Sequence, residues 1–284
     1  MNILVTGANG QLGQELKKRT ALLKKSNVLF TDVKELDITN KEAVDDFFKT
    51  HPFDYVVNCA AYTAVDKAET EQSAALSINR DAVSNLAEAC LKHNCFLIHI
   101  STDYVFDGKG CKPYTEQDFV EPTSFYGHSK LQGEQFAKNV QKGLIIRTSW
   151  LYSNFGNNFV FTMQKLGKTR KTLNVVFDQI GTPTFAGHLA EAIWLIIPQL
   201  TRWNEGVQIY HFSNEGVCSW YDFALEIMRQ CKLKCQVIPI ESKDYPTPAT
   251  RPFYSVLNKS KIKQRFGLVI PHWKDGLLEM LKAK

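Results

Sequence analysis

Residues 2–13 read NILVTGANGQLG, an apolar run that leads into a turn with three glycines. The apolar and β-branched residues over 2–6 predict a buried strand, and the residues after the turn favour a helix. Gly7, Gly10 and Gly13 permit a tight turn and let backbone amides approach a diphosphate at the N-terminus of that helix. The spacing is G-x-x-G-x-x-G rather than G-x-G-x-x-G, but its place directly after a first strand indicates a dinucleotide-binding turn.

A second strand is predicted over residues 28–31, and Asp32 follows it. A carboxylate at this place can accept hydrogen bonds from the ribose hydroxyls of an adenosine. The same charge disfavours the 2′-phosphate of NADP, whereas Lys34 partly offsets it. The sequence therefore leaves both NADPH and NADH open as cofactors.

Strands and helices alternate along the first half of the chain. Strands are predicted over 55–58, 96–100 and 144–148, and helices over 41–50, 74–93 and the segment that carries Tyr126. This alternation predicts an α/β fold with a doubly wound, Rossmann-like parallel sheet. Ligands bind at the carboxyl ends of the strands in such sheets, and Thr102 and Asp103 stand at one of these ends.

The pattern loosens after Trp150. Loops are predicted over 155–159, 178–184 and 245–252, helices over 187–197, 221–230 and 273–281, and a strand over 208–212. We expect residues 1–150 to form the dinucleotide-binding domain. Residues 151–284 are expected to form mainly a smaller substrate-binding part, with some segments returning to the Rossmann sheet.

Tyr126 and Lys130 are four residues apart, so they share one face of a helix. An ammonium about 4 Å from a phenol contributes about 4 kcal/mol at an effective dielectric constant of 20. That interaction would lower the pKa of Tyr126 by roughly three units, to where proton transfer at neutral pH is efficient. Alone, the pair is weak evidence, because such pairs also occur on ordinary helix surfaces.

Composition argues against several classes of protein. The seven cysteines form no C-x-x-C pair and the histidines no H-x-x-x-H pair, so we expect neither a disulfide framework nor a metal site. The net charge of +5 comes from scattered lysines, which does not favour nucleic-acid binding. The longest apolar run, 192–198, is too short to cross a bilayer, and residues 1–7 lack the features of a signal peptide. We therefore expect a cytoplasmic protein without membrane contact.

Taken in order, these features resemble the extended short-chain dehydrogenase/reductase superfamily. Within it, the chain is similar to the reductases of nucleotide-linked 4-keto-6-deoxy sugars. The residues that carry this similarity lie at 63–69, 101–108, 147–150, 156–159 and 245–252.

The resemblance implies a set of site residues. Thr102, Tyr126 and Lys130 would be catalytic. The dinucleotide would contact Gly10, Gln11, Leu12, Asp37, Ile38, Ala61, Tyr62, Thr63, Tyr126 and Lys130, beside the Gly7, Gly13 and Asp32 already named. The substrate would contact Thr102, Asp103, Trp150 and Arg251.

The implied reaction is NAD(P)H-dependent reduction of the 4-keto group of dTDP-4-dehydro-6-deoxy-L-mannose to dTDP-L-rhamnose, for cell-surface polysaccharide. The partner would be this small nucleotide sugar, although the nucleobase and the deoxysugar rest on resemblance alone. Such enzymes can be homodimers with a bridging magnesium. No acidic cluster with ligand spacing supports that metal here, so magnesium and the oligomeric state stay open.

Related activities are alternatives. A dehydratase would place a glutamate after Thr102 and Asp103, where this chain has Tyr104. A reductase or epimerase acting on another nucleotide-linked deoxysugar is harder to exclude, because it can use the same Tyr126 and Lys130. A non-catalytic nucleotide-binding subunit, similar to the regulatory subunit of methionine adenosyltransferase, is the alternative from a different class. The intact trio favours an enzyme.

Overall fold

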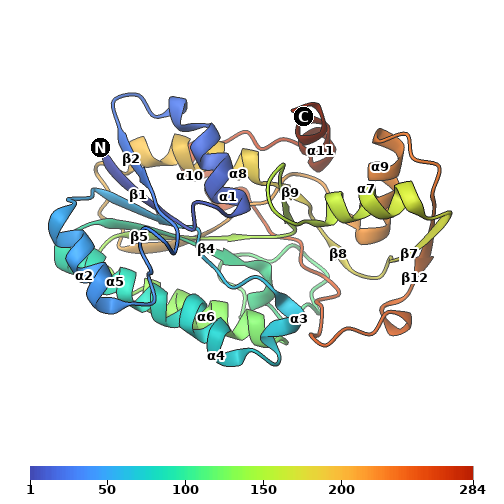
Figure 1. The fold of residues 1–284 in the computed structure, drawn as a ribbon, viewed down its shortest axis with the longest axis horizontal. Helices are drawn as coiled ribbons and strands as arrows, with labels where there is room; N and C mark the ends of the chain where they lie inside the picture. Colours follow the sequence, from blue (N-terminus) through green and yellow to red (C-terminus); the bar gives the residue numbers. More distant parts are fainter. Residues whose placement is uncertain (284) are drawn as a thin grey trace.

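The computed structural model describes residues 1–283 and is built around a six-stranded parallel sheet (Figure 1). Its strands are β1 (Asn2–Thr6), β2 (Asn27–Phe30), β3 (Tyr55–Asn58), β4 (Phe96–Thr102), β5 (Gly143–Thr148) and β10 (Val207–His211). They lie in the order β10-β5-β4-β3-β1-β2, so the strand order reverses between β1 and β3. This confirms the expected doubly wound sheet, whose ligand sites lie at such a reversal.

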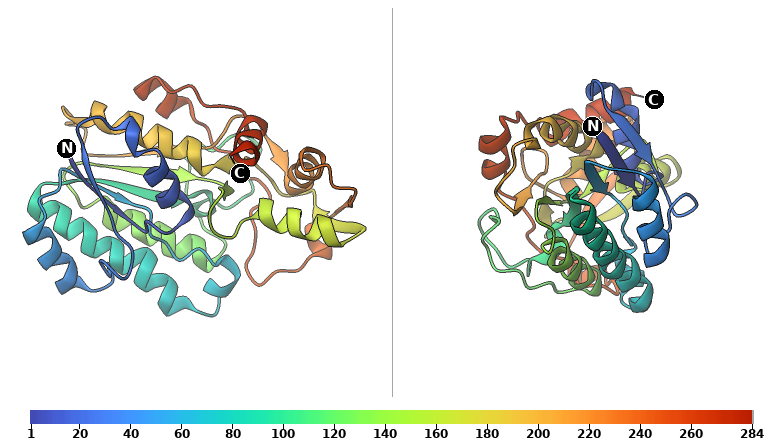
Figure 2. Two further views of the ribbon diagram at one scale, coloured as in Figure 1. Left: turned by 45° about the horizontal axis from the view of Figure 1, so that its top comes forward. Right: turned by 90° about the vertical axis from the view of Figure 1, so that its left-hand side faces the viewer.

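Helices cover both faces of the sheet (Figures 1 and 2). One face carries α1 (Gln11–Lys18), α8 (Ala186–Ile196) and α10 (Ser260–Phe266); the other carries α2 (Lys41–Thr50), α5 (Ala82–His93) and α6 (Phe125–Ala137). Each face has its own hydrophobic core: the first core lies between the sheet and α1, α8 and α10, and the second between the sheet and α2, α5 and α6. Ile3 and Val5 of β1 pack in the first core, and Leu4 packs in the second. Side chains of a strand alternate between faces, so a strand buried on both faces is apolar throughout.

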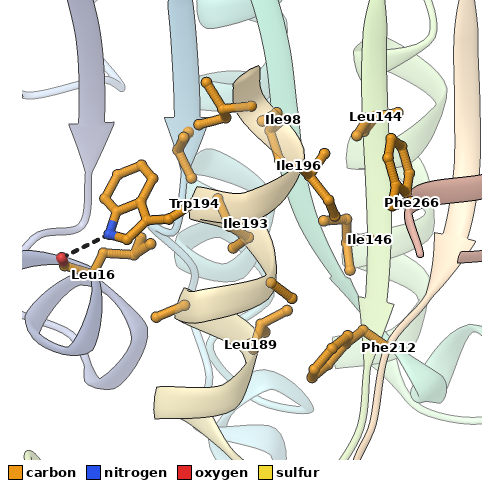
Figure 3. Packing of buried hydrophobic residues seen from close by; sticks show 14 of the residues in the cluster. Leu16, Ile98, Leu144, Ile146, Leu189, Ile193, Trp194, Ile196, Phe212 and Phe266 are labelled. Atoms are coloured by element: carbon orange, nitrogen blue, oxygen red, sulfur yellow. Dashed lines mark hydrogen bonds between the residues drawn. The ribbon is translucent and has the colours of Figure 1, made fainter. Parts of the chain in front are cut away.

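The first core joins distant parts of the chain. Leu189, Ile193 and Ile196 of α8 pack over the strands (Figure 3). The indole nitrogen of Trp194 donates a hydrogen bond of 3.0 Å to the Leu16 carbonyl oxygen of α1. This helix from the second half of the chain thus belongs to the core of the large sheet.

The helix expected over 74–93 is present and contains a π-helical turn. The structure has α4 (Gln72–Leu76), a π-helical turn at Ser77–Asp81, and then α5; a short helix, α3 (Val65–Ala68), precedes them. Asn79 of the π-helical turn is fully buried, and its carbonyl oxygen would lie 2.1 Å from a Cβ at Gly133 of α6. Helical residues run without a break from Gln72 to His93, which confirms the expected helix; its π-helical turn was not predicted.

A smaller part of the protein lies beside the sheet (Figure 1). It contains α7 (Phe159–Thr169), α9 (Trp220–Gln230), α11 (Trp273–Lys282) and a parallel pair, β7 (Thr172–Val176) with β12 (Gln236–Ile240). Two-residue strands form two further pairs, β6 (Leu151–Tyr152) with β9 (Thr184–Phe185), and β8 (Ile180–Gly181) with β11 (Cys218–Ser219). The sequence did not predict α7, α10, β7 or β12.

Candidate active site

A cleft of about 1030 Å³ lies at the carboxyl ends of the parallel strands, where the smaller part meets the sheet. The predicted site residues that line it are Gly7, Gly10, Gln11, Leu12, Asp32, Asp37, Ile38, Ala61, Thr63, Thr102, Asp103, Tyr126, Lys130 and Trp150. Within the described chain, three predicted site residues lie off its wall: Gly13, Tyr62 and Arg251.

The glycine turn is packed too closely for side chains at two of its positions. Gly7 has a φ of +64°, and a Cβ there would lie 2.6 Å from the backbone of Ala60. A Cβ at Gly13 would lie 2.5 Å from the Gly7 carbonyl oxygen. Helix α1 starts directly after Gly10, and no side chain caps it. Its first N–H groups are therefore available to an anion.

Tyr62 and Arg251, which do not line the cleft, form hydrogen bonds with other side chains. The Tyr62 hydroxyl donates to Glu71 over 2.6 Å. Arg251 donates to Asp66 over 2.6 Å and to the Tyr104 hydroxyl over 3.3 Å. Since Tyr104 itself lines the cleft, Arg251 lies one side chain away from it.

Local contacts fix the start of α6, which carries Tyr126 and Lys130. The Ser124 hydroxyl caps the helix by accepting from the Gly127 amide over 3.2 Å. Glu69 accepts from the Phe125 amide over 2.9 Å. These bonds turn one face of α6 toward the cleft, beside the end of β4.

Burial controls the acidity of Tyr126. It raises the pKa of the phenol above its ordinary value, and the hydrogen bond with Thr102 offsets this only in part. The expectation that Lys130 would lower this pKa was wrong for the structure. The Lys130 ammonium instead donates to the Ile100 carbonyl oxygen over 2.7 Å, and desolvation of the phenol dominates. Tyr126 therefore carries its proton at neutral pH.

Lys130 is 2% exposed, and burial lowers its pKa to about 8. The charge of Glu134, one turn further along α6, acts in the opposite direction and raises that pKa. A glutamate four residues after Lys130 lies on the same helix face, which was a usable signal that the sequence analysis missed.

Glu134 belongs to a buried network behind the cleft. Its carboxylate accepts from Arg147 over 2.8 and 2.7 Å and from the Ser101 hydroxyl over 2.6 Å. Both members of the ion pair are almost completely buried. The network thus connects α6, β4 and β5 immediately behind Lys130.

Asp103 is 2% exposed next to the catalytic candidates. Burial raises its pKa to about 6, although hydrogen bonds from Ser255 and Thr102 lower it. The Thr102 hydroxyl donates to Asp103 over 3.0 Å and accepts from the Tyr104 amide over 3.2 Å. Thr102 is therefore held in place on both sides.

Two tryptophans form the cleft wall on the side of the smaller part. Trp150 and Trp220 both line the cleft and stack on each other. A Cβ at Gly181 would lie 2.5 Å from the Trp150 ring, so only glycine fits beneath it. Trp220 was not predicted from the sequence, because no local pattern connects it with Trp150.

Asp32 is anchored by backbone amides at the end of β2. Its two carboxylate oxygens accept from the Asn9 amide over 2.8 Å and from the Val33 amide over 2.9 Å. Asp37 likewise accepts from the amide and the hydroxyl of Thr39. The negative charge of Asp32 therefore has a fixed position on the cleft wall.

Residues 1–283 contain neither a metal-binding cluster nor a membrane-spanning helix. No group of three or more histidine, cysteine, aspartate or glutamate side chains in this range could hold a metal ion. None of its helices is both long and apolar enough to cross a membrane. All seven cysteines are free thiols.

Known proteins resemble the chain over its whole length. Residues 1–284 match the family model described as RmlD substrate binding domain. The chain is 43% identical to a dTDP-4-dehydrorhamnose reductase of Aggregatibacter actinomycetemcomitans, over 97% of this chain and 96% of that protein. A crystal structure of a dTDP-4-dehydrorhamnose reductase from Clostridium acetobutylicum has a TM-score of 0.94 and 44% identity, covering 100% of this chain and 99% of that one. The Bacillus anthracis reductase, solved in complex with NADP, has a TM-score of 0.92 and 38% identity, with coverage of 100% and 99%.

Proposed function

The chain belongs to the dTDP-4-dehydrorhamnose reductase family and is an NAD(P)H-dependent reductase that forms dTDP-L-rhamnose; we propose that Thr102, Tyr126 and Lys130 carry out this reaction in the cleft. The observation that carries the proposal is the convergence of these side chains on one cleft wall. Residues 1–150 supply the dinucleotide site in this proposal, and residues 151–284 supply mainly the substrate side.

The cleft fits a dinucleotide. The uncapped start of α1 and the closely packed Gly7 and Gly13 leave room for a diphosphate beside backbone amides. When bound, NADPH or NADH supplies the hydride. The side chains that would hold it, by lining the cleft around the glycine turn and the ends of β2 and β3, are those of Gln11, Leu12, Asp32, Asp37, Ile38, Ala61 and Thr63.

Tyr126 acts as the proton donor. Because its pKa is raised, the phenol holds its proton until negative charge grows on the 4-keto oxygen. Thr102 hydrogen-bonds the same oxygen and stabilises that charge, which requires its hydroxyl to exchange the bond with Asp103 for the substrate. Lys130 places a positive charge next to the dinucleotide ribose and keeps it there through its bond to the Ile100 carbonyl oxygen.

The smaller part and the end of β4 hold the sugar nucleotide. Asp103 accepts a hydrogen bond from a sugar hydroxyl, and the Trp150 ring lies against the substrate. We assign Arg251 to the diphosphate, which a guanidinium can bind through two donors. This assignment requires Arg251 to exchange its bond with Asp66 for the substrate.

Other properties follow from this assignment as proposals. Both NADPH and NADH serve, since the NADP complex of the Bacillus anthracis relative favours the first and the Asp32 carboxylate favours the second. All proposed roles fall on a single chain, so a homodimer would leave them unchanged, and magnesium is given no step. Seven free thiols suit a reducing compartment such as the cytoplasm.

The test is loss of nicotinamide absorbance when the protein meets dTDP-4-dehydro-6-deoxy-L-mannose made in situ, with NADPH and NADH in parallel. Oxidation with formation of dTDP-L-rhamnose supports the proposal, and the ratio of the two rates gives the cofactor preference. No oxidation despite dinucleotide binding would instead favour another keto sugar or a non-catalytic subunit.

A further inference from the structure

Gln11 and Asn158 connect the glycine turn with the smaller part of the protein. The Asn158 amide nitrogen donates to Gln11 Oε1 over 3.2 Å and to the Ser153 carbonyl oxygen over 2.9 Å. Gln11 lines the cleft at the first residue of α1, whereas Asn158 does not line it. Any effect of Asn158 on a ligand in the cleft must therefore pass through another residue.

The orientation of both amides follows from a single backbone group. Asn158 caps α7, and its Oδ1 accepts from the Phe161 amide over 3.1 Å. A backbone N–H can only donate, so the oxygen of Asn158 must point to α7 and its NH2 group to Gln11. Gln11 then has to present its oxygen to Asn158, which leaves its own NH2 group for the cleft.

Ser153 does not set this orientation. Its hydroxyl lies 3.4 Å from Gln11 Oε1 but only 3.0 Å from the Phe155 carbonyl oxygen. A hydroxyl has one hydrogen and can also accept, so it fits either orientation of the Gln11 amide. Asn158 is the side chain that distinguishes between the two orientations.

We propose that Asn158 is a positioning residue for the dinucleotide, holding the Gln11 amide with its NH2 group toward the cofactor diphosphate. Resting on the proposed function, this inference adds a residue outside the cleft to the cofactor site. An NH2 group donates to phosphate oxygens, whereas the reversed amide would present its oxygen to them and repel them. The N-cap of a helix in the smaller part thereby contributes to cofactor affinity.

The test is a double-mutant cycle on NADPH binding, measured by the fluorescence of the bound dinucleotide without any sugar substrate. Asn158→Ser keeps an N-cap oxygen but cannot reach Gln11, so helix α7 and the melting temperature should be preserved. We expect NADPH to bind about tenfold more weakly to Asn158→Ser and to Gln11→Ala. Adding Asn158→Ser to Gln11→Ala should change the affinity by less than about twofold, because the group being positioned is already absent.

Asn158→Asp is the second variant. Its carboxylate caps α7 equally well but only accepts, so the Gln11 amide should reverse and NADPH binding should weaken at least as much as in Asn158→Ser. In turnover assays, the KM for NADPH should rise in both variants while kcat stays within about twofold of wild type.

The proposal would be overturned if Asn158→Ser weakened NADPH binding equally in wild type and in Gln11→Ala. It would also be overturned if Asn158→Ser left the affinity for NADPH unchanged. A wild-type protein that binds no NADPH would instead contradict the proposed function itself, so the two failures can be distinguished.

Discussion

The indole rings of Trp150 and Trp220 stack face to face, with centroids 3.6 Å apart and an interplanar angle of 5°. Trp150 has a φ of +47°, in the left-handed region that costs a non-glycine residue on the order of 1–3 kcal/mol. Such a backbone persists only where neighbouring contacts hold it. Trp220 therefore stabilises the position of the ring that we assign to the substrate.

Removing this support should weaken substrate binding. We expect Trp220→Ala to raise the KM for the sugar nucleotide about tenfold, because Trp150 loses its stacking partner. Trp220→Phe is the matched control and should retain most of the affinity. An unchanged KM in Trp220→Ala, measured at saturating NADPH, would contradict a supporting role.

Tyr126→Phe removes only the phenolic oxygen. We expect kcat to fall by about 10²–10⁴-fold, the usual contribution of a positioned proton donor. NADPH affinity should stay close to wild type, since the ring remains. The measurement is turnover with product analysis. Full activity in Tyr126→Phe would show that Tyr126 is not the proton donor.

The raised pKa of Asp103, about 6, predicts a pH dependence of stability. Between about pH 4 and 6 the folded protein holds a proton that the unfolded chain has released, so the stabilisation present at low pH is lost as pH rises. Relative to wild type, Asp103→Asn should therefore gain on the order of 3 kcal/mol in unfolding free energy between pH 4 and pH 7. Urea denaturation at each pH measures this difference.

Asp107→Asn provides a control of opposite sign. The Tyr114 hydroxyl holds the pKa of Asp107 below its ordinary value. The contribution of that carboxylate is present above its unfolded pKa and lost as pH falls through the lower folded pKa, so this variant should lose stability relative to wild type when the pH rises from about 2 to about 4, and should change little between about pH 4 and 7. If the unfolding free energies of both variants had the same pH dependence, burial would be excluded as the cause of the raised pKa of Asp103.

Glu134→Gln should destabilise the protein by about 3–5 kcal/mol, because it leaves the buried Arg147 charge without its partner. It should also move the basic limb of the pH–rate profile to lower pH, since Glu134 raises the pKa of Lys130. Glu88→Gln, in the exposed pair with Lys41, is the control and should change the stability very little. Similar losses in the two variants would argue against the buried network.

Asp32→Asn should shift cofactor preference toward NADPH. Removing a fixed negative charge near the adenosine ribose should raise the ratio of kcat/KM for NADPH to that for NADH by about tenfold. Glu35→Gln is a suitable control, because Glu35 accepts from the Asp32 amide but does not line the cleft. A larger shift of cofactor preference in Glu35→Gln than in Asp32→Asn would show that Glu35, and not Asp32, determines this preference.

Local signals made much of the fold predictable. The strand and turn at 2–13 were evident, because burial on both faces produces an apolar run and close packing requires glycine at positions 7 and 13. The helix over 74–93 was also predictable, but its π-helical turn, which packs closely against Gly133 of α6, has no local signal in the sequence.

Side-chain partners in the candidate site were less predictable. The spacing of Tyr126 and Lys130 predicts a Coulomb interaction, but desolvation dominates the pKa of Tyr126 in the folded protein. Trp220 and Arg147 reach their partners only once the sheet and the smaller part have formed. No periodicity in the sequence indicates such contacts between distant side chains.

The position of β10 at the edge of the sheet has a consequence for synthesis on the ribosome. Its partner β5, buried along its whole length, ends about 60 residues before β10 begins, which corresponds to roughly 3–12 s of translation. During this interval the apolar β5 strand of the nascent chain has an unpaired edge that could join another chain. Protection of that edge by a chaperone would matter most in these seconds, before β10 emerges.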